Sequence, residues 1–293
     1  MNTKNVINKF YEILKTADYP KHPDTVVIGP SSGGLAKKDK VEGLQPKKFT
    51  ERDVWSYYDG IKSDIIKDLK GKNLFVRLKA DTGFIYVRHP FGGNSEYIRI
   101  GNEKDFNTYN NGRIVEFHQT MGATCDTYVV DFDAVGDWNK TKKITGEIYD
   151  ELEKLPGGAV SIIYTGKRGF HLLKKIKPVP VDKARETLKE WLKTTFGDRD
   201  DLVVGESPEG SKGALGTSPM KLNGGQVALW SLRVTGLCCV EVPRNALNLF
   251  KREDASLEKI YKHLTGKVFI SMKQKKSIER IMEAVQIKSY DYL

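Results

Sequence analysis

Residues 128–133 read YVVDFD, a β-rich apolar run that ends in two acidic residues. Successive side chains of a strand point to opposite faces, so Asp131 and Asp133 leave the same face of the predicted sheet. Two carboxylates that project together repel one another unless a cation compensates them. Mg²⁺ and Mn²⁺ take oxygen ligands of this kind, often with substrate phosphates completing the shell. The pair therefore predicts a divalent metal site, although an arbitrary Asp-x-Asp pair more often only ends a strand.

A glycine-rich basic loop follows the next predicted strand. Residues 164–171 read YTGKRGFH, in which two glycines flank Lys167 and Arg168. The glycines allow close approach of backbone N–H groups, the cations add positive charge, and His171 offers a phosphate donor. The loop is predicted to cradle a triphosphate. The plainer alternatives are a solvated turn and a satisfied core histidine.

Composition narrows the class of protein. The 293 residues are 39% hydrophobic and 29% charged, with a net charge of +10, which suits a globular protein with a phosphate-bearing partner. The cysteines, Cys125, Cys238 and Cys239, form neither an even disulfide framework nor a zinc pair, which favours a reducing compartment. No signal-peptide pattern or bilayer-length apolar run is found, so we expect a cytoplasmic, intracellular protein with no membrane partner.

Short alternating strands mixed with amphipathic helices predict an α+β (mixed α/β) fold. The predicted organisation is an N-terminal helix and basic loop over 1–48, a core over 49–250, and a basic helical segment over 251–293. Helices are expected over 5–17, 50–69, 141–155, 181–196 and 256–284, and strands over 74–78, 83–88, 96–100, 114–118, 127–132, 159–164, 227–230 and 236–242. Residues 205–225 hold six glycines and are expected to be irregular.

The two motifs, in this order, resemble the archaeo-eukaryotic primase (primase-polymerase) superfamily, and most closely the polymerase domain of bacterial end-joining ligase D. That family follows an Asp-x-Asp strand with a Ser-Gly-x-x-Gly-x-His loop. The matching positions here are Asp131 and Asp133, then Thr165, Gly166, Gly169 and His171. The segments 116–118 (EFH) and 229–233 (LWSLR) are similar to further family segments, and 235–237 (TGL) echoes the primase small subunit.

The resemblance implies a two-lobed fold with central antiparallel or mixed sheets flanked by helices. It also implies a template-dependent nucleotidyltransferase, a DNA primase or polymerase, that uses two Mg²⁺ or Mn²⁺ ions. Its partners would be nucleoside triphosphates, a nucleic-acid template or primer, and a replication or repair protein. Catalysis and metal binding would fall to Asp131 and Asp133, and phosphate binding to Thr165, Arg168, His171, Ser231 and Arg233, with His118 beside the sugar.

Other basic residues extend these predictions. Lys167 and Lys212 are added to the nucleotide site on charge and proximity in sequence. Lys47, Lys48 and Arg52 would meet a terminal phosphate of the nucleic acid, as basic residues do in the family. The C-terminal lysines are expected to grip template or a partner helix, or simply to form a solvated face.

One departure from the family pattern concerns a third carboxylate. Its expected place holds Thr217, Ser218 or Pro219, and no acidic residue stands between positions 210 and 226. The nearest candidates are Asp201, Glu206 and Glu209. A missing carboxylate would weaken the second metal more than nucleotide binding.

Two alternative functions therefore stay open. One is a catalytically weak or inactive nucleotide- and nucleic-acid-binding accessory subunit of a replication or repair complex. The other is a metal-dependent nuclease. It is less favoured because the glycine-rich basic loop fits a triphosphate better than a cleaved backbone.

Overall fold

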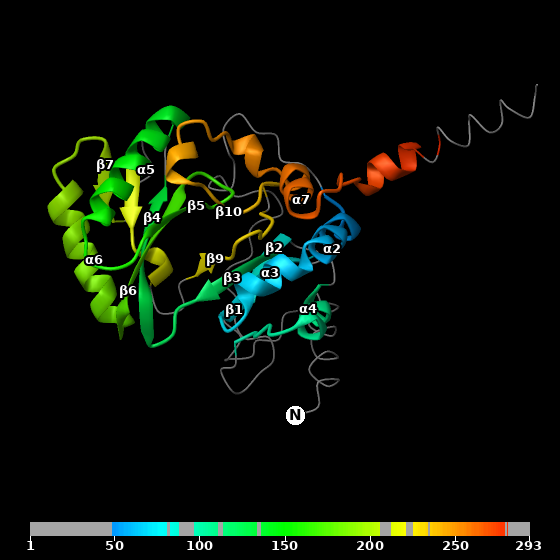
Figure 1. Ribbon diagram of the computed structural model, residues 1–293, viewed down its shortest axis with the longest axis horizontal. Coiled ribbons are helices and arrows are strands. Elements are labelled where there is room, and N and C mark those ends of the chain that lie inside the picture. Colours follow the sequence, from blue (N-terminus) through cyan, green and yellow to red (C-terminus); the bar gives the residue numbers. More distant parts are fainter. Residues whose placement is uncertain are drawn as a thin grey trace, which may run out of the picture.

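Two β-sheets with helices around them form the scaffold of the protein (Figure 1). The computed structural model describes residues 49–80, 83–87, 97–110, 114–133, 136–205, 212–220, 225–233, 235–278 and 280. The predicted helix over 5–17, together with Lys47 and Lys48, lies outside the described residues. The predicted α+β class is confirmed.

The larger sheet has six strands in the order β10-β5-β6-β4-β8-β7. All neighbours are antiparallel except β7 and β8, which run parallel. Its long central strands, β4 and β6, carry the acid pair and the end of the basic loop. The strands are β4 (Thr124–Asp133), β5 (Val160–Tyr164), β6 (Phe170–Pro180), β7 (Leu202–Val204), β8 (Gly213–Gly216) and β10 (Val240–Glu241).

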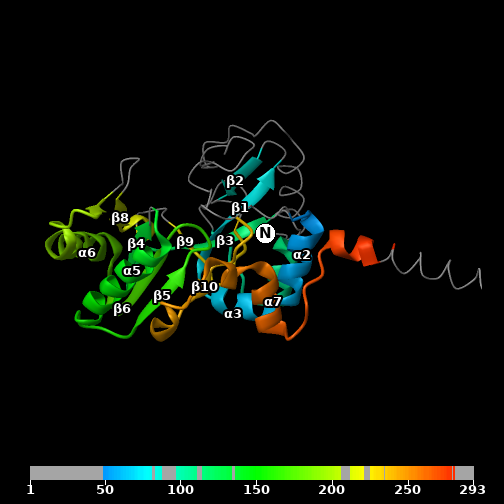
Figure 2. The same ribbon diagram turned by 90° about the horizontal axis from the view of Figure 1, so that it is seen from above.

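The smaller sheet has four antiparallel strands in the order β2-β1-β3-β9 (Figure 2). They are β1 (Asn73–Ala80), β2 (Gly83–Val87), β3 (Ile114–Thr120) and β9 (Gln226–Val227).

The helices cover the outer faces of the two sheets. In Figure 1, α5 and α6 lie along the larger sheet, while α2, α3, α4 and α7 gather around the smaller one. A capping box between Thr50 and Asp53 begins α2 and satisfies backbone donors of its first turn. The helices are α2 (Glu51–Gly60), α3 (Lys62–Leu69), α4 (Glu103–Tyr109), α5 (Trp138–Glu153), α6 (Val181–Phe196) and α7 (Leu257–Thr265), with 3₁₀ turns η2 (Ser218–Met220), η3 (Arg244–Ala246) and η4 (Arg252–Ala255).

The segment 225–242 ties the two sheets together. Its start pairs with β3 as β9, and its end pairs with β5 as β10. Between them the backbone folds back, with Trp230 N donating to Cys239 O (2.8 Å) and Cys239 N donating to Ser231 O (2.9 Å). This fold-back places residues 231–233 between the sheets, next to the basic loop.

Several predicted elements end elsewhere than expected. The helix predicted over 50–69 is two helices that meet at Ile61, and the one over 256–284 is interrupted at Gly266, whose left-handed φ of 70° ends α7. Residues 97–100 form only an isolated bridge to β1, while β8 and η2 lie inside the glycine-rich stretch predicted to be irregular. Helix α4 was not predicted. Among the described residues, none of the helices is long and apolar enough to cross a membrane.

Candidate nucleotide and metal site

The acid pair lies on the open face of β4, opposite the face that packs against the helices. Val130 and Phe132 point into the hydrophobic core and are at most 1% exposed. Asp131 and Asp133 alternate with them and keep 25% and 51% of their side-chain surface exposed. The alternation of strand side chains thus delivers two accessible carboxylates on one face, as predicted.

The basic loop reaches the same face from β6. His171 is the register partner of Asp131, with its Nε2 3.4 Å from Asp131 Oδ1. Arg168 Nη2 lies 3.6 Å from Asp133 Oδ2. The structure therefore brings together two acids and two phosphate-binding candidates that come from separate parts of the sequence.

Hydrogen bonds within the loop fix its shape. Thr165 Oγ1 donates to Gly169 O (3.1 Å), and the Tyr164 hydroxyl donates to Lys167 O (2.8 Å). Gly166 has a φ of 71°, a left-handed conformation that favours glycine. Its carbonyl accepts from Thr235 Oγ1 (2.6 Å), which ties the loop to the segment between the sheets. Hydrogen bonds within the loop, and one from Thr235 of the segment between the sheets, thus hold the loop in one conformation.

The electrostatics of the pair fit a bound cation. Burial and the adjacent Asp131 raise the pKa of Asp133, while Arg168, His171 and Lys167 oppose the rise. Buried His171 has an Nδ1 without a hydrogen-bond partner among the described residues. No three His, Cys, Asp or Glu side chains converge on a metal position within the described ranges. Two carboxylates completed by substrate phosphates are nevertheless a common shell for Mg²⁺.

Gly169 sets how closely the loop approaches the acid strand. A Cβ at this position would overlap the carbonyl oxygen of Phe132 and come within 3.0 Å of Asp133 Cα. No side chain can be fitted there without moving the backbone of the loop or of β4.

For the nucleotidyltransferase activity that the resemblance implies, Gly169→Ala should lower nucleotide incorporation by about 10²-fold, because a shift of about 1 Å in a reacting group has an effect of this size. Steady-state incorporation of a labelled nucleotide measures it. Gly122→Ala is the matched control, since a Cβ at Gly122 meets nothing within 4 Å. Equal activities of the two variants would show that the close approach is unimportant.

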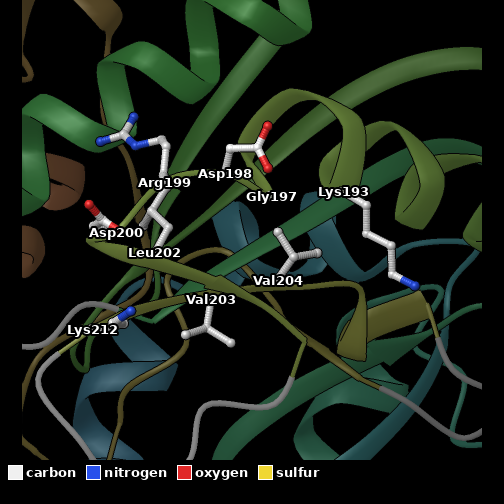
Figure 3. A pocket seen from close by; sticks show the side chains of 9 residues that line it. All are labelled: Lys193, Gly197, Asp198, Arg199, Asp200, Leu202, Val203, Val204 and Lys212. Atoms are coloured by element: carbon white, nitrogen blue, oxygen red, sulfur yellow. The ribbon is translucent and has the colours of Figure 1, made fainter.

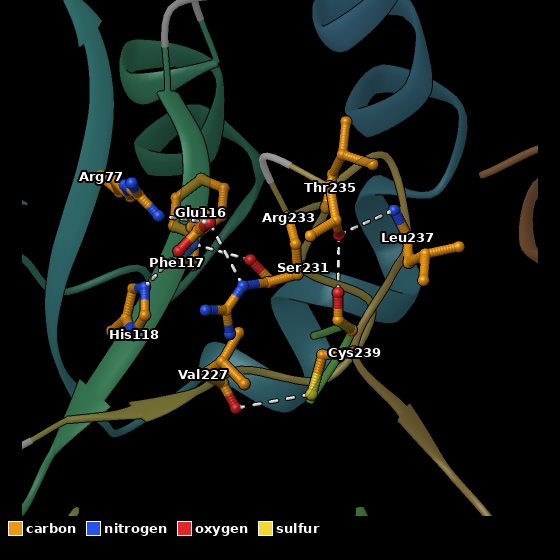
Figure 4. A network of polar contacts seen from close by, with 12 residues as sticks. Arg77, Glu116, Phe117, His118, Val227, Ser231, Arg233, Thr235, Leu237 and Cys239 are labelled. Atoms are coloured by element: carbon orange, nitrogen blue, oxygen red, sulfur yellow. Dashed lines mark hydrogen bonds and ion pairs between the residues drawn. The ribbon is translucent and has the colours of Figure 1, made fainter. Parts of the chain in front are cut away.

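A buried ionic cluster lies beside the loop (Figure 4). Glu116 of β3 is fully buried, and its Oε1 lies 3.2 Å from both Arg77 Nη1 and Arg233 Nε. Its Oε2 lies 2.9 Å from His118 Nε2. Burial by itself would raise the pKa of Glu116, but Arg233, His118, Lys167 and Arg77 hold it well below its usual value. An ionised carboxylate therefore holds together Arg77 of the smaller sheet and Arg233 of the segment between the sheets.

His118 stands in this cluster as a neutral side chain. Burial lowers its pKa to about 4, although its contact with Glu116 opposes the shift. Its ring stacks on Phe75, with centroids 4.8 Å apart and an interplanar angle of 12°. This position is on the smaller sheet, whereas the acid pair is on the larger one.

The remaining predicted ligands lie in three different settings. Ser231 is fully buried, and its Oγ accepts from the backbone N–H of Phe117 (2.8 Å). Its hydroxyl thus links the segment between the sheets to β3. Arg233 is 6% exposed and is paired with Glu116 next to the loop. Arg52 is exposed on the first turn of α2.

Lys212 lies in a pocket of about 540 Å³ at the β7 edge of the larger sheet (Figure 3). Lys193 of α6 and residues 197–200 line the same pocket. The residues lining this pocket do not include the acid pair, Arg168 or His171. Lys212 thus lies among side chains other than those of the acid pair and the basic loop.

Candidate third carboxylates are not brought to the acid pair within the described residues. Asp201 is engaged by Arg199, whose Nε and Nη2 donate to its two oxygens (3.0 and 3.1 Å). Glu206 and Glu209 lie outside the described residues. The β8 position directly opposite Asp131 is Gly216. Directly opposed residues share a face with Cβ atoms about 5 Å apart, so a side chain at 216 would stand beside Asp131.

We expect Gly216→Asp to bind Mn²⁺ several-fold more tightly than the wild type, because it adds a third oxygen ligand. A Cβ at Gly216 meets nothing closer than 3.8 Å, so the strand can accept it. Electron paramagnetic resonance of free Mn²⁺ measures the affinity, and Gly216→Asn is the uncharged control. Without metal, the aspartate variant should be less stable than the asparagine variant, because three carboxylates repel. Identical Mn²⁺ affinities of the two variants would show that a side chain at position 216 does not reach the metal beside Asp131.

Sequence reasoning missed the role of Glu116 and its partner Arg77. Each of two largely apolar strands carries a charged residue between apolar neighbours, Arg77 in β1 and Glu116 in β3, and the two are register partners. Opposite charges within apolar strands are a signal of a buried ion pair. The resemblance covers the whole EFH segment, 116–118, but implies a role only for His118.

Comparison with known proteins addresses the fold. No family model matches the chain, and no curated protein matches it. Among solved structures, it is similar to the polymerase domain from Mycobacterium tuberculosis Ligase D in complex with DNA. The TM-score is 0.60 at 15% identity, and the match covers 80% of this chain and 98% of that domain. The chain has a primase-polymerase fold. At this identity the likeness shows the fold alone.

Proposed function

We propose that the protein is a nucleotidyltransferase of the primase-polymerase type that joins nucleotides on a nucleic-acid template. The observation that carries the proposal is the convergence of Asp131 and Asp133 with Arg168 and His171 on one open sheet face. The shared fold supports it, because the similar polymerase domain was solved in complex with DNA.

In the proposed reaction, a primer 3′ hydroxyl attacks the α-phosphorus of a nucleoside triphosphate. A new P–O bond forms and the hydroxyl proton passes to water. The bond between the α-phosphorus and the oxygen that bridges it to the β-phosphate breaks, and pyrophosphate leaves with the electron pair of that bond. A divalent metal held by Asp131 and Asp133 would offset the charge of the carboxylates and phosphates and stabilise the reacting oxygens.

The chain's own cations complete the proposed site. Arg168 and Lys167 are half-buried and lie in the loop whose shape is fixed by its hydrogen bonds. A preorganised cation needs little rearrangement when negative charge develops on the leaving pyrophosphate. Arg233 would add a further charge from the segment between the sheets, while Glu116 holds its guanidinium in place.

The proposal is tested by incubating purified protein with a primed template, a labelled nucleoside triphosphate and Mn²⁺ or Mg²⁺. We expect metal-dependent incorporation that a chelator abolishes. Nucleotide binding without incorporation on primed or unprimed templates would overturn the catalytic claim. Strand degradation without added nucleotide would favour the nuclease.

A second candidate is a nucleotide-binding relative with little catalysis, acting as an accessory subunit. The observation that favours it is Gly216 opposite Asp131, with no third carboxylate at the acid pair among the described residues. This candidate predicts that the wild type binds nucleotide and strand without turnover. It also predicts that Asp131→Ala still binds both.

A further inference from the structure

The chain has a long basic stretch near its C-terminus. Between Glu258 and Glu279 it carries six lysines and no acidic residue: Lys259, Lys262, Lys267, Lys273, Lys275 and Lys276. Lys259 is paired with Asp254 (2.7 Å). The other five are exposed and form no ion pair among the described residues. The stretch therefore presents uncompensated positive charge to solvent.

The last part of this stretch stands away from the body of the protein. We call residues 267–278 the C-terminal arm. Figures 1 and 2 show it extending away from both sheets, and residues 272–278 are helical. Every residue from 273 to 278 is exposed, so this helix has no buried face. A helix this short is marginal in water, and neighbouring lysines repel, so a polyanion would stabilise it.

The base of the arm is attached to α7 and to the start of α2. Phe269 is buried and packs edge-on against Tyr261 of α7, with ring centroids 5.2 Å apart. The backbone N–H of Met272 donates to Asp53 Oδ1 (2.7 Å), and Asp53 also caps the start of α2. The arm thus begins at a fixed place, next to the first turn of α2.

The neighbouring surface of α2 suits a nucleic acid. Arg52 precedes Asp53 and is exposed, with no ion pair among the described residues. Trp55 is 43% exposed, and its spacing of three residues from Arg52 places the two on one face of the helix. A cation beside an exposed aromatic ring is the combination that binds a phosphate backbone and stacks a base.

We propose that the C-terminal arm, together with Arg52 and Trp55, binds the sugar-phosphate backbone of a single-stranded nucleic acid. The lysines of the arm would neutralise successive phosphates, and Trp55 would stack an unpaired base. Trp55 favours a single strand over a duplex, whose bases are already stacked. The inference rests on the proposed function only in that the strand would be its template or primer.

The test is the salt dependence of strand binding, measured by fluorescence anisotropy with a labelled single-stranded oligonucleotide. The arm variant is Lys273→Gln/Lys275→Gln/Lys276→Gln. The matched control, Lys177→Gln/Lys183→Gln/Lys189→Gln, removes the same charge from exposed positions on β6 and α6. We expect the slope of log affinity against log salt to fall by about 2 in the arm variant, about 0.7 per lost contact, with little change in the control. Trp55→Ala should weaken binding without changing the slope.

Three results would overturn the inference: no strand binding by the wild type, wild-type binding by the arm variant, or equal losses in both triple variants. The last would show an effect of net charge alone. An acidic protein partner is indicated if the arm variant loses that partner but keeps the strand. Strand binding that depends on the arm in a protein without nucleotide incorporation would refute the proposed function and leave this inference standing.

Discussion

Asp131→Ala and Asp133→Ala should each reduce nucleotide incorporation by about 10³-fold or more. The pair is proposed to hold the metal that stabilises the reacting oxygens, and a loss of about 4 kcal/mol of transition-state stabilisation corresponds to that factor. Incorporation of a labelled nucleotide on a primed template measures it. Nucleotide binding should fall much less, because Arg168 and His171 remain.

The fold should survive these substitutions. Both aspartates are partly exposed. Burial and, after it, repulsion by Asp131 raise the pKa of Asp133, and removing either carboxylate relieves that repulsion. Melting temperatures are therefore expected to stay at or above the wild-type value. Asp126→Ala is the control, since Asp126 is an exposed acid on the same strand whose partner is Lys175. If Asp126→Ala lost as much activity as Asp131→Ala, the acid pair would have no special role.

Glu116→Ala should lower the free energy of unfolding by about 3–5 kcal/mol, because it leaves Arg77 and Arg233 buried without their shared carboxylate. For a chain of this size the melting temperature would fall by roughly 10 °C. Thermal unfolding followed by circular dichroism measures the change.

Two further variants separate charge from volume. Glu116→Gln keeps the shape but removes the charge, so it should be nearly as destabilising as the alanine variant. Glu151→Gln breaks an exposed ion pair with Lys154 and should cost less than about 1 kcal/mol. A Glu116→Gln variant as stable as the wild type would show that the cluster is not held by the carboxylate charge.

The parts of the site that follow from local patterns were predictable from the sequence. Asp131 and Asp133 alternate with Val130 and Phe132, and in any strand this alternation puts the two acids on one face and the two apolar residues on the other. The basic loop joins β5 to β6, which are neighbours along the chain and pair with each other, as such strands commonly do. The pairing of β6 with β4, which places His171 opposite Asp131, passes over β5 and does not follow from that rule. The α+β class followed from the same alternation of short strands and helices.

The parts that depend on long-range pairing were not predictable in this way. Strands were predicted over 227–230 and 236–242, but β9 and β10 have only two residues each, and no local pattern indicates that they join different sheets. These two short pairings hold the segment with Arg233 between the sheets. The shared position of Glu116 and Arg233 arises only from that crossing. Gly266 is different, because a glycine after basic residues is a helix-end signal that the sequence did offer.

The central claim is tested most directly by a crystal structure of the protein with Mn²⁺ and a non-hydrolysable nucleoside triphosphate, with anomalous data for the metal. We expect an anomalous peak at Asp131 and Asp133, and the triphosphate along residues 165–171 in contact with Arg168 and His171. A triphosphate bound elsewhere, for example beside Lys193 and Lys212, or an acid pair without a metal peak, would contradict the account.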